Sequence, residues 1–174
     1  MSGHQWPLEG FVFFDGRCRC GLLEPEHGPV LQRLLERDPE FFELEFGLPP
    51  GPSEAQSAYV SLPEGKSYED KFLLGIFRAS ELIGVIDVIR DYPRTGVWTF
   101  GTIFVDPGTR REGIGTAAVE GVQRQVARCG GDRLRGVASN RNLAALAFAA
   151  KLGYVASCEQ PEAGDTVLEL DLDA

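Results

Sequence analysis

The middle of the chain consists of three apolar runs separated by short polar segments. The runs cover residues 72–77, 82–89 and 97–105 and are rich in Phe, Leu, Ile and Val. Residues 78–81 and 91–96 are polar or charged, and the second segment also contains Pro and Gly, which favour tight turns. Apolar runs joined in this way predict three strands of an antiparallel meander.

After this meander the period of the apolar positions changes from strand to helix. Residues 113–129 carry an apolar side chain at every fourth position and end at a Gly-Gly pair, which predicts a helix. The apolar row of this helix consists of Ile114, Ala118, Val122 and Val126. The short apolar run 134–138 predicts a strand parallel to 97–105, because a helix connects the two.

The last third is expected to contain one more helix and a closing pair of strands. The helix covers residues 142–152, and the strands cover 154–159 and 167–172. The apolar stripe of the helix is expected from Leu143, Leu146, Ala147 and Ala150. Strand, helix and parallel strand together form a βαβ back half.

The first third combines a strand with short helices. Apolar and polar side chains alternate in part of residues 17–23, which predicts a strand, whereas residues 1–16 are either a loose tail or a short extra strand. Helical spacing is present near residues 30–35 and 40–46, and the capping-box pattern Ser53-x-x-Gln56 predicts a third helix start. No repeat or linker divides the chain. The prediction is therefore one α/β (α+β) domain over residues 1–174, with a mixed sheet of about six to seven strands.

Charge and composition limit the classes of partner. A net charge of −9 and a pI of about 4.7 argue against nucleic acid and favour a cationic or amine substrate. The sequence has neither an apolar run of about 18 residues, the length of a membrane span, nor the pattern of a signal peptide at residues 1–7, so we expect a cytoplasmic protein. Cys18 and Cys20 share one face of a strand but lack the further ligands of a zinc site. We therefore expect Cys18, Cys20, Cys129 and Cys158 to be reduced thiols, and no metal.

The stretch 103–116 carries the most specific chemistry. A strand ends at Val105, and Arg110-x-x-Gly113-x-Gly115 opens the next helix. The first N–H groups of a helix have no intrahelical partner, and glycines let a ligand approach the backbone. Cations here are unfavourable to the helix itself, so Arg110 and Arg111 suit a bound anion. The stretch predicts a phosphate-binding cradle.

Two other phosphate-binding patterns fit this stretch less well. Gly113-x-Gly115-x-x-Ala118 has the spacing of a dinucleotide fingerprint, which requires glycines directly after the strand and an acidic residue ending the next strand. Residues 106–112 intervene here, and the next strand ends in Ala-Ser-Asn. A nucleotide P-loop is excluded because no Lys-Ser or Lys-Thr follows the second glycine. A dinucleotide-binding domain stays as the weakest of three hypotheses.

Two motifs give the chain a family resemblance. Ile103-x-Val105-x-Pro107-x-x-Arg110-x-x-Gly113-x-Gly115 resembles the acetyl-coenzyme A motif of the GNAT superfamily of N-acetyltransferases. Downstream, Asn142-x-x-Ala145-x-x-Phe148-x-x-Lys151-Leu152-Gly153-Tyr154 is similar to the second signature of that family. The order of the predicted elements over residues 17–172 also agrees. The resemblance implies that the strands ending at Val105 and Ala138 splay apart and admit the thioester of acetyl-coenzyme A.

The resemblance also implies which residues hold this co-substrate. The backbone of Ile103, Phe104 and Val105 would bind the pantetheine arm as an added strand binds a sheet edge. Asn142 would contact the pantetheine or the ribose side, and Phe148 would pack against the cofactor or within the core. The pyrophosphate would be held by Arg110 and by the backbone of Arg111, Glu112, Gly113, Ile114, Gly115 and Thr116.

The implied reaction is direct attack of a neutral primary amine on the thioester. A backbone N–H at Phe104 or Val105 would stabilise the oxyanion. A carboxylate would take the proton of the amine, directly or through water. Candidates for this base are Asp87, Asp91, Glu43 and Glu45. Asp87 is notable because it lies in an apolar strand, where an unpaired carboxylate is costly.

One position departs from the family. Many members have a tyrosine directly after the position of Phe148, and it protonates the leaving thiolate; this chain has Ala149. Ser139 or Tyr92 are alternative donors, whereas Tyr154 belongs to the Leu-Gly-aromatic signature and is expected to pack.

The first hypothesis is therefore an acetyl-coenzyme A-dependent N-acetyltransferase with a small-molecule or peptide amine as acceptor. The second is a non-catalytic acyl-coenzyme A-binding module, which the alanine at position 149 favours. A homodimer that uses the apolar residues 11–14 is an open option.

Overall fold

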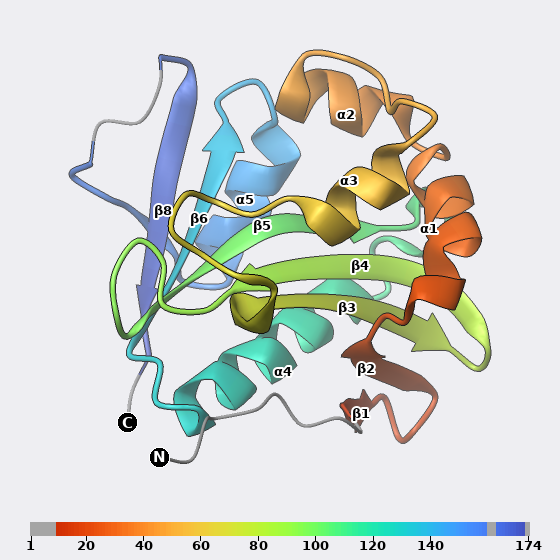
Figure 1. Cartoon of the computed structure of the whole chain (residues 1–174), viewed down its shortest axis with the longest axis horizontal. Helices are drawn as coiled ribbons and strands as arrows, with labels where there is room; N and C mark the ends of the chain where they lie inside the picture. Colours follow the sequence, from red (N-terminus) through yellow and green to blue (C-terminus); the bar gives the residue numbers. More distant parts are fainter. Residues whose placement is uncertain (1–9, 160–162, 173–174) are drawn as a thin grey trace.

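One mixed sheet runs through the protein (Figure 1). The computed structural model describes residues 10–159 and 163–172. Within them the sheet has eight strands in the order β1-β2-β3-β4-β5-β6-β8-β7. The strands are β1 (Phe11–Phe13), β2 (Cys18–Leu22), β3 (Lys71–Arg78), β4 (Glu81–Ile89), β5 (Val97–Val105), β6 (Arg133–Ser139), β7 (Val155–Ala156) and β8 (Asp165–Asp171). The fold class is as predicted, and the sheet is slightly larger than expected.

Five α-helices connect these strands within the described residues. They are α1 (Gly28–Leu35), α2 (Pro39–Phe46), α3 (Glu54–Val60), α4 (Ile114–Arg128) and α5 (Leu143–Lys151). Strands β3, β4 and β5 form the predicted antiparallel meander, and β6 pairs parallel to β5 after α4, which confirms the βαβ back half. Helix α3 starts directly after Ser53, as predicted, but the Ser53 side chain makes no cap hydrogen bond, and Gln32 Oε1 accepts from Ala55 N instead. No helix in the described part of the chain is long and apolar enough to cross a membrane.

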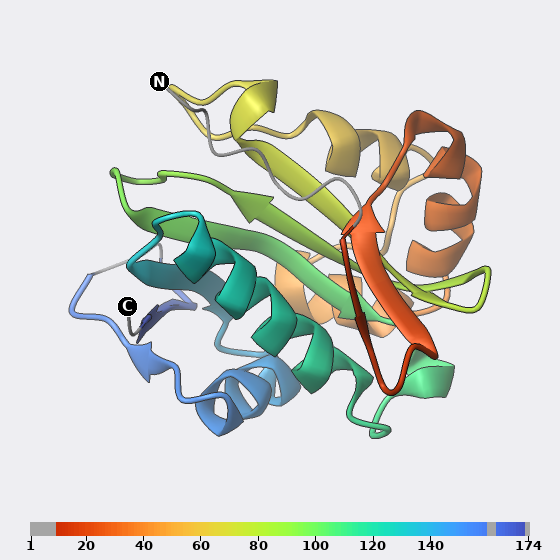
Figure 2. The same cartoon turned by 90° about the horizontal axis from the view of Figure 1, so that it is seen from below.

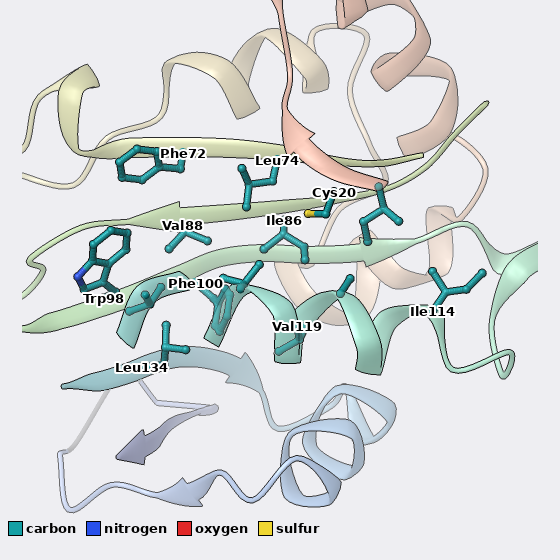
Figure 3. Packing of buried hydrophobic residues seen from close by; sticks show 14 of the residues in the cluster. Cys20, Phe72, Leu74, Ile86, Val88, Trp98, Phe100, Ile114, Val119 and Leu134 are labelled. Carbon is teal, nitrogen blue, oxygen red and sulfur yellow. The ribbon is translucent and has the colours of Figure 1, made fainter. Parts of the chain in front are cut away.

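The helices cover both faces of the sheet (Figures 1 and 2). Helix α4 lies on one face, and α1, α2 and α3 lie on the other. Strand β3 therefore buries alternate side chains on opposite faces: Phe72 and Leu74 pack toward α4, whereas Leu73 and Phe77 pack toward the front helices. Figure 3 shows the cluster on the α4 side, where Val119 and Ile114 meet the sheet residues. Burial on both faces explains why this strand reads as a continuous apolar run.

The β5 and β6 strands separate after a short paired segment. Their parallel pairing runs only from Val97 to Phe100 on β5 and from Arg133 to Gly136 on β6. Beyond this point β5 stays paired with β4, whereas β6 stays paired with β8 as far as Ser139. The β4–β5 register also shifts between Ile86 and Val88. The structure thus has the predicted splay of the two strands.

The N-terminal hairpin packs on the body of the same chain. Residues 1–9 of the predicted tail lie outside the described residues, but Phe11–Phe13 form the predicted extra strand. Phe11, Phe13 and Phe14 pack against the main core cluster, and only Val12 points mostly into solvent. The rings offered as an interface between two copies are therefore used within the chain.

Candidate cofactor groove

A groove of about 700 Å³ fills the space between the separated strands. Its walls are the outer half of β5, the end of β6 and one side of α5, and α2 lies across it. The floor near the splay is formed by Phe100 and Gly136, the last paired residues of β5 and β6. At the other end the groove reaches the segment 109–116, which contains the predicted cradle.

This cradle presents unpaired backbone N–H groups. Within the described part of the chain, the N–H groups of residues 110–116 donate to no protein acceptor, and the first helical bond of α4 runs from Ala117 N to Gly113 O. Arg111 and Gly113 have left-handed backbone conformations, with φ of 67° and 80°. Gly115 faces the groove between Val105 and the Phe148 ring. Free N–H groups at a helix start and alternating backbone handedness suit an anion such as pyrophosphate.

The two arginines of this segment have different surroundings. Arg110 pairs with Asp38 at 2.6 Å between Nη1 and Oδ2, and its Nε donates to the carbonyl of Val105. Its guanidinium also lies over the Phe104 ring. Arg110 therefore joins α2 to the end of β5, and because it also lines the groove, its contact with pyrophosphate stays a prediction. Arg111 is exposed at the groove and pairs with no carboxylate among the described residues.

Glu112 is turned away from the groove. Its carboxylate pairs with Arg78 at 3.1 Å, and the residue does not line the groove. Only the backbone N–H of this residue is placed with the cradle. Thr116 and the buried Ile114 both line the groove, as expected for the first turn of α4.

The strand register decides which backbone groups face the gap between β5 and β6. Asp106 N donates to Ile83 O, and the β4–β5 register pairs Phe104 with Val85. Because hydrogen-bonded pairs alternate along an antiparallel ladder, the N–H of Phe104 points toward β4. Of the two backbone donors predicted for the oxyanion, Phe104 and Val105, this register disfavours Phe104. The neighbouring residues Ile103 and Val105 direct their N–H groups toward the gap.

Helix α2 is tied to the opposite wall of the groove. Glu45 accepts from Ser139 N at 3.1 Å and from Asn142 Nδ2 at 2.8 Å. Arg141 Nη2 donates to the carbonyl of Glu43. Asn142 is buried, and its Oδ1 caps α5 by accepting from Ala145 N. Its side chain thus has a structural role, and because Asn142 also lines the groove, its contact with the cofactor stays a prediction.

We expect Glu45→Ala to destabilise the fold by about 1–3 kcal/mol, because two buried donors lose a charged acceptor. Calorimetric unfolding measures this loss. The matched control is Glu43→Ala, since the exposed Glu43 side chain makes no such bond within the described residues and its backbone contact with Arg141 is kept. Equal stability of the two variants would show that the Glu45 tie contributes nothing.

Asp87 is a residue of β4 and does not line the groove. Its Oδ2 pairs with Lys71 Nζ at 2.8 Å, and both side chains are almost fully buried. A Cβ at Gly101 would collide with the Asp87 carboxylate, so the glycine of β5 makes room for it. Burial raises the pKa of Asp87, and Lys71 opposes this rise. The notable carboxylate of the sequence is thus a buried ion-pair partner outside the groove, an arrangement that disfavours its predicted role as base.

Of the other carboxylates predicted as bases, only one lines the groove. Asp91 accepts from Gly96 N within the β4–β5 turn, and neither Asp91 nor Glu43 lines the groove. Glu45 does line it, together with two acidic residues that sequence reasoning did not select, Asp38 and Glu40. Glu40 could have been found from its position on the same short helix as Glu45, whereas no pattern in the sequence indicates the pair between Asp38 and Arg110.

The second family motif lines the inner wall. Phe148 and Ala149 face the groove, and the Phe148 ring lies near Gly115, as expected for a residue that packs against the cofactor. Tyr154 packs in the main core cluster, as predicted, and it also lines the groove. The alternative donors Ser139 and Tyr92 do not line it.

The cysteines show no sign of a shared site. Cys18 and Cys20 are both buried on one face of β2, and all four cysteines are free. Burial raises the pKa of Cys20 to about 12, which leaves it an unreactive thiol.

The splayed strands, the groove and the cradle are the features of one class of protein, the acyl-coenzyme A-dependent acyltransferases. The chain belongs to the acetyltransferase (GNAT) family, whose model matches residues 31–154. Among curated proteins, no sequence match is found.

Solved structures agree with this assignment at the level of the fold. An acetyltransferase from Thermus thermophilus superposes with a TM-score of 0.74 at 21% identity, covering 89% of this chain and 97% of that one. The PaiA N-acetyltransferase of Thermoplasma acidophilum, solved in complex with coenzyme A, gives 0.70 at 17% identity, covering 88% and 98%. The ribosomal-protein-S18-alanine N-acetyltransferase of Escherichia coli gives 0.66 at 16% identity, covering 90% and 95%.

Proposed function

We propose that the protein transfers an acetyl group from acetyl-coenzyme A to a primary amine. The observation that carries this proposal is the groove between β5 and β6, with unpaired N–H groups at residues 110–116 at one end and a free edge of β5 along its side. A diphosphate fits the first feature, and an amide-containing arm fits the second. The coenzyme A complex of the Thermoplasma protein supports the same ligand.

In the proposed reaction the amine attacks the thioester near the point where β5 and β6 separate. The N–H of Val105 is one of two backbone donors of β5 that face the gap, and we take it rather than Phe104 as the oxyanion donor. The proton of the amine leaves through water to the acidic residues of α2 that line the groove, Glu40 and Glu45. These carboxylates, with the net charge of −9, favour a cationic amine of a small molecule or peptide as the acceptor. We place this activity in the cytoplasm.

The second candidate function is binding of an acyl-coenzyme A without catalysis. Ala149, which lines the groove where many family members carry the acid, is the observation that favours it. In that case the protein would bind coenzyme A but consume no thioester with any amine.

Calorimetry with coenzyme A, followed by release of free thiol from acetyl-coenzyme A in the presence of a panel of amines, tests both candidates. We expect binding, and thiol release that depends on one class of amine. Binding without turnover across the panel would favour the second candidate. Absence of coenzyme A binding would overturn both.

A further inference from the structure

In the proposed reaction the leaving coenzyme A thiolate takes a proton from a donor in the groove. The structure limits which side chains can be this donor. Ala149 supplies none, and Ser139 and Tyr92 do not line the groove. Among the described residues that line the groove, the tyrosine at position 154 is the one with a phenol.

Tyr154 is brought to the groove by the way α5 ends. Its backbone N–H donates to the carbonyl of Ala149 at 3.0 Å, and Gly153 makes the turn with φ of 91°. This capping contact folds the chain back so that the small Ala149 side chain and the Tyr154 ring line the same wall. A tyrosine at position 149 would occupy groove space that the alanine leaves open.

The hydroxyl of Tyr154 is held in its donor form. Gln123 Nε2 of α4 donates to the hydroxyl oxygen at 3.2 Å, and no described residue accepts the hydroxyl's own proton. The residue is 8% exposed, and burial raises its pKa to about 12, so the phenol stays protonated at neutral pH. One oxygen lone pair is thus engaged while the proton remains free for a ligand.

The position along α4 also suits the reacting end of the ligand. Gln123 lies eight residues beyond Gly115, or about 12 Å along the helix axis. Val119, one turn before Gln123, is the last α4 residue that lines the groove, so the contact between Gln123 and Tyr154 lies at the inner end of the groove. Phe100 and Gly136, where the strands separate, form the floor there.

We infer that the Tyr154 hydroxyl protonates the departing coenzyme A thiolate, in the place of the acid that is absent at position 149. The inference rests on the proposed function. The amine nitrogen forms a bond to the carbonyl carbon, the C–S bond breaks and its electron pair stays on sulfur. The sulfur takes the Tyr154 proton, and the phenolate regains a proton from solvent, while the amine's own proton leaves through water. The products are the amide and coenzyme A thiol.

The test measures the thiol of bound coenzyme A and needs no acceptor. Coenzyme A labelled with ¹³C next to sulfur is titrated by NMR in complex with the unaltered protein and with Tyr154→Phe, which keeps the packed ring. A donor hydrogen bond stabilises thiolate, so we expect the bound thiol to titrate about one pKa unit higher in the variant, with similar coenzyme A affinity. Tyr92→Phe is the matched control and should leave the bound thiol unchanged.

Equal thiol pKa values in the unaltered protein and Tyr154→Phe would overturn the inference and leave the proposed function intact. Failure of the unaltered protein to bind coenzyme A would overturn the proposed function instead. Once an acceptor is known, Tyr154→Phe should lower kcat roughly 100-fold. Adding Ala149→Tyr to this variant should restore part of the rate, and no restoration by a groove-facing phenol would count against an acid at this wall.

Discussion

Gly115→Leu will weaken coenzyme A binding by about 100-fold or more, which corresponds to about 2.7 kcal/mol. A Cβ at this position would lie 3.4 Å from Val105 Cγ2 and 3.7 Å from the Phe148 ring, so a leucine fills the narrow passage between the cradle and the groove. The backbone of Gly115 is not left-handed, and leucine favours a helix more than glycine does. The fold should therefore survive while the ligand is excluded.

Isothermal calorimetry with coenzyme A measures this effect. Ala147→Leu adds the same side chain to the exposed face of α5 and should bind coenzyme A as the unaltered protein does. Unchanged affinity in a folded Gly115→Leu protein would mean that the ligand does not pass this point, and the cradle at the start of α4 would no longer be its site.

Asp87→Ala will destabilise the protein by about 3–5 kcal/mol, because it leaves the Lys71 ammonium buried with neither a carboxylate nor a neutral carboxyl group as its partner. Only 4% of the Lys71 side chain is exposed, so water cannot replace the lost partner. Denaturant unfolding measures the loss. The double variant Lys71→Met/Asp87→Leu removes both charges and should be close to the unaltered protein in stability. If the single and double variants were equally unstable, packing rather than the ion pair would explain the effect.

The double variant also tests the pH dependence and the role of this carboxylate. The raised pKa of Asp87 means that the folded state holds its proton more tightly than the unfolded chain does. Its contribution to stability is therefore present below the unfolded pKa of about 4 and is lost as pH rises through the higher folded value. Relative to the double variant, the unaltered protein should lose stability over that window. Retention of acyltransfer by the double variant would confirm that Asp87 is not the base.

The fold was predictable where the signal was local. The strands of the meander and the α4 row Ile114, Ala118, Val122 and Val126 followed from side-chain period, and all four of these residues are buried. The splay followed from the family motifs. The buried face of α5 was harder to predict, because leucines and alanines occur on all sides of this helix. Leu143, which was assigned to the apolar stripe, is 72% exposed. The side of α5 that faces the groove carries Ala145, Phe148 and Ala149.

Partners distant in sequence were beyond prediction. Glu45 contacts Asn142, Asp38 contacts Arg110 and Asp87 contacts Lys71 across separations that no periodic pattern encodes. Glu45 and Asp87 were interpreted alone as bases and Arg110 as a phosphate ligand, whereas Asp38 and Lys71 were given no role. The structure shows instead that much of the charge around the groove joins its walls together.

The N-terminal hairpin determines how short a stable fragment of the chain can be. The family model begins at residue 31, beyond β1 and β2. Yet the Phe11 ring occupies the space that a side chain at Gly121 of α4 would need, Phe14 lies beside Gly113, and β2 covers the edge of β3. A fragment that began at residue 31 would expose the surface of α4 around Gly121 and the unpaired edge of β3. Unpaired strand edges favour aggregation. The segment that the family model matches is thus shorter than the segment that packs together as one core.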